Sequence, residues 1–134
     1  MATFTVAASE LKYASGSSWS SGKARQGVYS TTRYEGAIRF SELANYDFSN
    51  IEISQIRMKV TFGAAGGAST KYLTFYQASK DEISGSISSM RGNSIGAIEV
   101  SEAFDRTIIL SFNSNSQSDI FSALKSYFSS GNQT

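Results

Sequence analysis

The sequence predicts one all-β domain, an antiparallel β-sandwich with one short surface helix near the C-terminus. Three observations predict it: short segments of alternating apolar and polar residues, clusters of Ser, Gly and Asn between them, and a single later segment with helical spacing. Alternation with a period of two is typical of strands, and short strands separated by turn residues favour a sandwich over a parallel sheet. A length of 134 residues suits one domain with one core, which we place at residues 1–134.

The clearest strand spans residues 55–62, where apolar and polar residues alternate without interruption. Residues 63–69 are rich in Gly and Ala and interrupt the alternation, as a loop does. Residues 72–76 are rich in aromatic and β-branched residues, which favour strands. We therefore expect the two strands to form a hairpin around the loop.

Shorter segments predict the remaining strands. They are residues 1–6, 36–40, 95–100 and 107–112. We expect two antiparallel sheets packed face to face, with one apolar side of each strand in the core. The expected core residues are Ile38, Phe40, Ile56, Met58, Val60, Phe62, Phe75, Leu110 and Phe112.

One helix is expected over residues 118–128. Its apolar face consists of Ile120, Phe121, Leu124 and Phe128. Ser116 or Ser118 is expected to cap its start, and Gly131 lies where a helix ends. We expect it to dock on the sandwich through three residues, Ile120, Leu124 and Phe128.

The composition excludes several kinds of chemistry. Histidine and cysteine are absent, which removes the usual general base near neutral pH, the common zinc ligands and the thiol nucleophile. No phosphate-binding loop, dinucleotide fingerprint or nucleophile elbow occurs. The 11 carboxylates are interpreted as solvated surface charges, not as a hydrolytic pair or a calcium site. We therefore expect no enzymatic activity, no metal and no cofactor.

Charge and hydropathy limit the partners and the setting. The 12 Lys and Arg balance 11 Asp and Glu and are scattered, so we expect no nucleic-acid partner. No apolar segment has the length of a membrane span, and the start has no secretory signal peptide. A chain without cysteine suits synthesis in a cytosol, followed by a virion or extracellular location reached without a signal peptide, as for virion proteins released by lysis.

Four residues near the N-terminus form the candidate ligand site: Trp19, Tyr29, Arg33 and Tyr34. Exposed aromatic rings are surfaces on which sugar rings stack, and an arginine can reach sugar hydroxyls. In the alternative interpretation, Trp19 folds over the edge of the core and its indole N–H bonds to the backbone, because large aromatic residues in small domains are usually buried. Exposure of the rings distinguishes the two.

The order of segments resembles that of DNRLRE-type β-sandwich domains. The shared landmarks are an opening strand, an Arg-Phe pair in a strand, an Ile-led alternating strand, and a short helix followed by Gly-Asn. In this chain they lie at residues 4–9 with 22–27, at 38–41, at 53–60, and at 121–128 with 131–134.

The resemblance implies a jelly-roll module of the kind found in phage structural proteins and large surface proteins. The leading hypothesis is a non-enzymatic structural domain of an assembly, such as a phage tail, fibre or decoration protein, whose partners are other subunits in a homo-oligomer. The alternative is a carbohydrate-binding module whose partners are surface glycans. The family's last strand would begin after Thr134, so we expect the polypeptide to continue into it or a neighbouring subunit to supply it.

Overall fold

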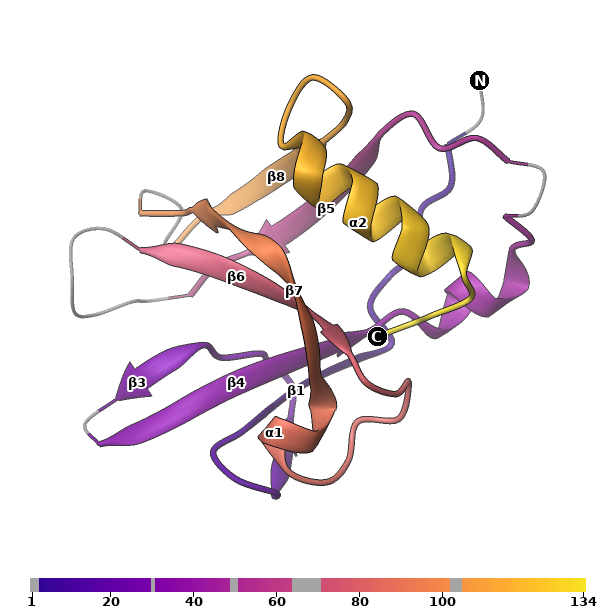
Figure 1. Ribbon diagram of the computed structural model, residues 1–134. Coiled ribbons are helices and arrows are strands. Elements are labelled where there is room, and N and C mark those ends of the chain that lie inside the picture. Colours follow the sequence, from indigo (N-terminus) through magenta and orange to yellow (C-terminus); the bar gives the residue numbers. More distant parts are fainter. Residues whose placement is uncertain (1–2, 30, 49–50, 64–70, 102–104) are drawn as a thin grey trace.

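The computed structural model describes residues 3–29, 31–48, 51–63, 71–101 and 105–134, without the side chains of Val28 and Tyr29 (Figure 1). Within these residues the chain forms β-strands, two α-helices and one 3-10 helix. In chain order they are β1 (Glu10–Ala14), β2 (Trp19–Ser21), β3 (Gly27–Tyr29), β4 (Thr32–Arg39), the 3-10 helix η1 (Ser41–Asn45), β5 (Ile56–Thr61), β6 (Tyr72–Ala78), α1 (Ile87–Met90), β7 (Arg91–Glu99), β8 (Thr107–Phe112) and α2 (Ser118–Ser129).

The strands form three antiparallel sheets. One has four strands in the order β2-β1-β4-β3, and the other two are the pairs β5-β8 and β6-β7. In Figure 1 the β6-β7 pair lies between the four-stranded sheet and the β5-β8 pair. The prediction of a β-rich antiparallel fold with one helix near the C-terminus is confirmed. The two expected sheets are instead three among the described residues.

The strongest predicted strand is confirmed, but its predicted partner is wrong. In β5 half-buried and exposed residues alternate along the whole strand. It pairs with β8, and β6 pairs with β7, so residues 55–62 and 72–76 do not form a hairpin. The physical reason is register: Met58 lies opposite Leu110 and Val60 opposite Ile108, so the pairing aligns two apolar faces.

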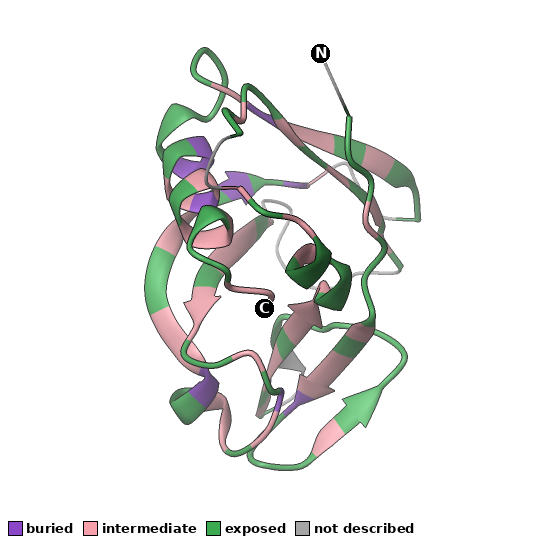
Figure 2. Cartoon of the chain, turned by 90° about the vertical axis from the view of Figure 1, so that its right-hand side faces the viewer, coloured by how far each residue is buried: buried purple, intermediate pink, exposed green. Residues whose placement is uncertain are grey.

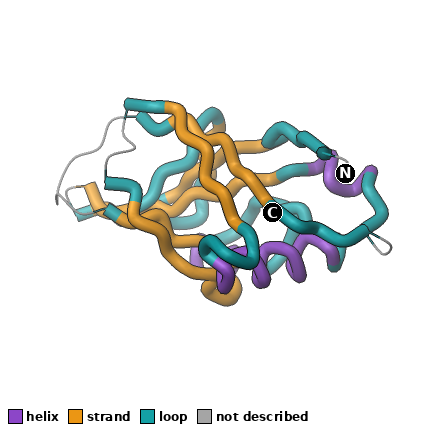
Figure 3. The backbone as a smooth tube through the Cα atoms, turned by 90° about the horizontal axis from the view of Figure 1, so that it is seen from above, coloured by secondary structure: helices purple, strands orange, loops and turns teal. Residues whose placement is uncertain are grey.

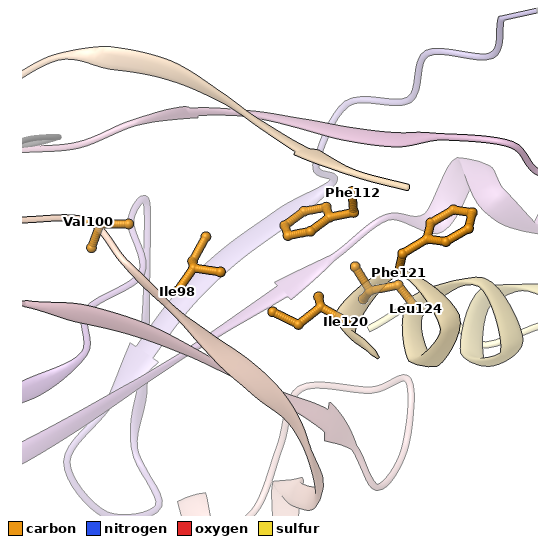
Figure 4. Close-up of a cluster of buried hydrophobic side chains, with 6 residues drawn as sticks. All are labelled: Ile98, Val100, Phe112, Ile120, Phe121 and Leu124. Atoms are coloured by element: carbon orange, nitrogen blue, oxygen red, sulfur yellow. The ribbon is translucent and has the colours of Figure 1, made fainter. Parts of the chain in front are cut away.

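The core lies where the two short sheets meet α2. Seen from above, α2 lies along one side of the strands (Figure 3). The buried cluster comes from β7 and the residue that follows it, from β8 and from α2 (Figure 4), and it consists of Ile98, Val100, Phe112, Ile120, Phe121 and Leu124. Half-buried Phe128 also packs against it, so the predicted docking face of the helix is confirmed. α2 thereby closes the space between two sheets that would each be marginal alone.

The predicted core residues are found mostly at the margin of this cluster. Phe112 is fully buried. Five other predicted core residues are half-buried and pack against the cluster: Ile56, Met58, Phe62, Phe75 and Leu110. Val60, Ile38 and Phe40 are half-buried as well. Figure 2 shows how few positions of the chain are fully buried. Much of the apolar surface of the strands is thus only partly covered by the described chain.

Other expectations require correction. Of the strand expected at residues 1–6, residues 1–2 lie outside the described residues and residues 3–6 form no strand; the four-stranded sheet begins at Glu10, where β1 pairs with β4. Neither serine caps α2 with its side chain: Gln117 precedes the helix in a left-handed conformation, and Ser116 exchanges backbone hydrogen bonds with Asn113. The predicted stop is confirmed, since Gly131 has a φ of +91° and its N–H donates to the Phe128 carbonyl.

The last residues are tied to two distant segments. The Phe40 N–H donates to the Gln133 carbonyl at 2.8 Å, and the Gln133 N–H donates to the Asp81 carboxylate at 2.8 Å. The Tyr127 hydroxyl lies 2.8 Å from the carbonyls of both Ala78 and Thr134. Residues 132–134 therefore connect α2 to the ends of β4 and β6. The expectation of a further strand stays a prediction.

Gly96 allows α2 to approach β7 closely. Its φ is +154°, and a Cβ at this position would lie 2.8 Å from Ile120 Cγ1. Any side chain would therefore strain the backbone and push Ile120 out of the core.

We predict that Gly96→Ala lowers the free energy of unfolding by about 1–3 kcal/mol, the usual cost of overpacking. Urea denaturation measures it. Gly63→Ala is the matched control, because open space surrounds that glycine and its φ is not positive, and it should change stability by less than about 0.5 kcal/mol. Equal effects of the two substitutions would contradict the close approach.

The Tyr127 phenol predicts a loss of stability at high pH. Burial raises its pKa above the ordinary value, and the nearby Asp81 carboxylate acts in the same direction. Above the pKa of the unfolded chain, about 10, the unfolded state binds fewer protons than the native state. The free energy of unfolding should therefore fall as pH rises from about 10 through the higher folded pKa.

Tyr127→Phe should flatten this part of the pH dependence. It should also cost about 1–2 kcal/mol at neutral pH, because the Ala78 and Thr134 carbonyls lose their donor. Tyr72→Phe is the control, since Tyr72 is 55% exposed. Urea denaturation at several pH values measures both, and an unchanged pH profile in Tyr127→Phe would contradict the assignment.

Candidate functional site

The four-stranded sheet carries the predicted ligand residues, and it distributes them over both of its faces. Successive residues of a strand point to opposite faces, so Arg33 and Glu35 of β4 share one face and Tyr34 lies on the other. On β2, Trp19 is in register with Ala14, which is in register with Glu35. Trp19 therefore lies on the face of Arg33 and Glu35.

On this face, a carboxylate lies between two guanidinium groups. Glu35 Oε1 is 3.3 Å from Arg33 Nη2 and 3.0 Å from Arg91 Nη1. The Arg91 guanidinium lies 5.6 Å from the centre of the Tyr76 ring. We call Arg33, Glu35, Arg91 and Tyr76 the Glu35 cluster. It joins β4 to β6 and β7 and carries a net charge of +1.

The Glu35 carboxylate is poorly placed for catalysis. Its side chain is only 16% exposed, and the same oxygen contacts both guanidinium groups, so it is held as an ion-pair partner. Arg33 is the outermost member, with 62% of its side chain exposed. The cluster therefore provides a contact between sheets and one accessible guanidinium, which can bind an anion or a hydroxyl.

Trp19 is fixed by a hydrogen bond to the backbone. Its indole N–H donates to the Gly85 carbonyl at 2.8 Å, and the residue is half-buried. Its neighbour across the ladder, Ala14, is 1% exposed. The backbone hydrogen bond is the one that the alternative interpretation expects, and it uses the only polar group of the indole.

On the opposite face, Tyr34 belongs to a different group. Its ring lies 6.0 Å from the Tyr13 ring in an edge-on arrangement, and the Arg25 guanidinium lies 4.4 Å from the Tyr13 ring centre and 5.5 Å from that of Tyr34. A Cβ at Gly36 would lie 2.7 Å from the Ala24 Cβ, so only glycine lets this segment cross the sheet so closely. We call Tyr13, Arg25 and Tyr34 the Arg25 stack.

The predicted site residues are therefore not brought together. Trp19 and Arg33 lie on one face of the sheet and Tyr34 on the other. The side chain of Tyr29 lies outside the described residues, although its backbone belongs to β3. Sequence reasoning missed Glu35, Arg91, Tyr76 and Arg25, which come from segments far apart in the chain.

Other candidate chemistry finds little support in the part of the chain that the structure describes. No three acidic residues there gather into a group that could hold a metal ion. Likewise, none of its helices is long and apolar enough to cross a membrane. The Asp81 carboxylate accepts a hydrogen bond from the Gln133 N–H.

A cavity of about 360 Å³ lies between the segment before β5 and one side of α2. It is open to solvent, and its lining mixes apolar, charged and hydroxyl groups: Ile51, Glu52, Ile53, Lys125, Ser126 and Ser129. A ligand pocket normally encloses most of its ligand, whereas this cavity is open to solvent.

Comparisons of the chain with models of protein families, with curated proteins and with solved structures find no match.

We predict that the two arginines of the Glu35 cluster differ in their effect on stability. Arg91→Met should lower the free energy of unfolding by about 1–2 kcal/mol, because a poorly exposed carboxylate loses its shorter ion pair. Arg33→Met should cost less than about 0.5 kcal/mol, because its side chain is mostly exposed. Urea denaturation measures both, and a larger effect of Arg33→Met would refute the proposed role of the cluster.

Proposed function

We propose that this chain is a non-enzymatic structural domain of a protein assembly, in particular a tail, fibre or decoration component of a phage particle. The resemblance to DNRLRE-type domains supports the setting. The nested pairing, with β6-β7 enclosed between β5 and β8 in the chain, supports a jelly-roll relationship, since a jelly roll folds an antiparallel ribbon over itself. In such a particle the domain would act through contacts between subunits.

The observation that carries the proposal is the unpaired edges of the β5-β8 sheet. Among the described residues no third strand adjoins either β5 or β8. The outer edge of β6, in contrast, is covered by a side chain. The Gln26 amide donates to the Tyr72 carbonyl at 2.9 Å and accepts a hydrogen bond from the Thr74 N–H at 3.1 Å. Exposed strand edges are templates for pairing with another chain, and soluble proteins usually cover or charge them.

The edge of β8 is suited to a second copy of the chain. The Phe62 N–H donates to the Arg106 carbonyl, so this pair of opposite residues is hydrogen-bonded. Hydrogen-bonded and non-hydrogen-bonded pairs alternate along an antiparallel ladder, and the pairs that contain Thr107, Ile109 and Ser111 are therefore of the second kind. The outward backbone groups of β8 therefore belong to Thr107, Ile109 and Ser111. These residues are uncharged, and Ile109 is 58% exposed, the largest value among the exposed large apolar residues. An uncharged edge can pair with its own copy about a two-fold axis without repulsion.

The carbohydrate-binding alternative is less well supported. It requires aromatic rings that share one exposed surface, whereas Trp19 and Tyr34 lie on opposite faces of the sheet. A glycan array with Trp19→Ala as control remains the direct test, and a sugar signal that disappears in this variant would favour the alternative over assembly.

We predict concentration-dependent self-association through β8. In sedimentation experiments the average mass of the chain should rise with concentration, and Ile109→Lys should suppress the rise, because it places a charge on the edge. Ile51→Lys is the control: Ile51 is also exposed but lies beside α2. A monomer at all concentrations, or equal effects of the two variants, would count against self-association at this edge.

A further inference from the structure

The edge of β5 differs from that of β8 because it carries two positive charges. Arg57 and Lys59 are exposed, and no ion pair involving either of them occurs among the described residues. Across the ladder, Arg57 faces Ser111 and Lys59 faces Ile109. Within the described residues, the outer face of the β5-β8 pair therefore presents two cations and one exposed apolar side chain, and its exposed positions include no carboxylate.

The backbone of the same residues is directed toward the open edge. The orientation of the backbone N–H and C=O groups alternates along a strand. Because the Phe62 N–H bonds to Arg106 of the chain before β8, the backbone groups of Val60 and Met58 also face β8. Side chains lie closer together in pairs of residues that do not exchange backbone hydrogen bonds. The Thr61 and Thr107 hydroxyls are 2.8 Å apart, which agrees with such a pair. The N–H and C=O groups of Arg57, Lys59 and Thr61 are therefore those that face away from β8.

The inner face of β5 has an incomplete cover. Ile56, Met58 and Val60 are half-buried, not buried, although they lie on the core side of the strand. A strand added along β5 would place every second side chain beside these residues. Its intervening side chains would lie beside Arg57 and Lys59 on the outer face.

We propose that the outer edge of β5 binds an extended strand of another protein in which apolar and acidic residues alternate. The apolar side chains would extend the inner face of β5, and the carboxylates would pair with Arg57 and Lys59. A second copy of β5 is disfavoured as the occupant, because a two-fold contact would bring these cations together. The proposal adds a second kind of contact to the proposed assembly function: β8 joins like subunits, and β5 receives a different one.

Backbone pairing supplies the affinity in this mode of recognition, and alternate side chains supply the specificity. The probe is a fluorescent peptide of about seven residues that alternates valine and glutamate, a length close to that of a common strand. We expect it to bind the intact chain in anisotropy measurements. A peptide with lysine in place of glutamate should bind at least about tenfold more weakly, as should a glutamate peptide N-methylated along one edge.

The variant Arg57→Glu with Lys59→Glu should reverse the preference between the two peptides. Lys23→Glu with Lys80→Glu is the matched control. It makes the same change of net charge at two other exposed positions, and it should leave the preference unchanged. Circular dichroism establishes that each variant is folded. In addition, peptide binding should slow hydrogen exchange at the amides of Arg57, Lys59 and Thr61.

Several results would overturn the proposal: equal binding of the glutamate and lysine peptides, binding that survives N-methylation of both peptide edges, or a preference that the control variant also reverses. Absence of peptide binding by a chain that still self-associates would refute this site and leave the proposed function standing. Conversely, peptide binding by a chain that stays monomeric would support this site and contradict self-association through β8.

Discussion

The fold depends on the close contact between α2 and β7. Gly96 leaves room for Ile120, and this lets the helix insert Phe121 and Leu124 beside Ile98. Neither two-stranded sheet has enough neighbours to be stable alone, so the helix supplies the surface against which both of them pack. Among the described residues, the apolar core is consequently a junction of the β5-β8 pair, the β6-β7 pair and α2.

The four-stranded sheet is attached to this junction by a different kind of interaction. Glu35 pairs with Arg91, the Trp19 indole bonds to the Gly85 carbonyl, and the Gln26 amide bonds along β6. These contacts are polar and directional, whereas those around α2 are apolar. These hydrogen bonds and charge pairs thus help to position the sheet, and they fix geometry while adding modestly to stability.

The sequence predicted those parts of the fold that a regular apolar pattern specifies. The alternation in β5 and the helical face of α2 are both found. β1 was missed although Leu11 and Tyr13 alternate with Glu10 and Lys12, because this alternation covers only a few residues. Strand pairing could not be predicted, since it follows from register between segments far apart. For the candidate site, the adjacency of Arg33 and Tyr34 already placed them on opposite faces of any strand, but the Arg91 partner of Glu35 carries no local signal.

The nested order of strands has a consequence for the kinetics of folding. Pairing β5 with β8 closes a long loop, and closing it costs chain entropy before any contact compensates. If β6 and β7 pair first, they shorten that loop, and α2, which follows β8 directly, can then dock on the ribbon already formed. The tie from the Gln133 carbonyl to the Phe40 N–H spans a longer separation than the β5-β8 pairing and would form late. Until β8 and α2 are in place, the apolar face of β5 stays uncovered, so other strands can pair with it during folding.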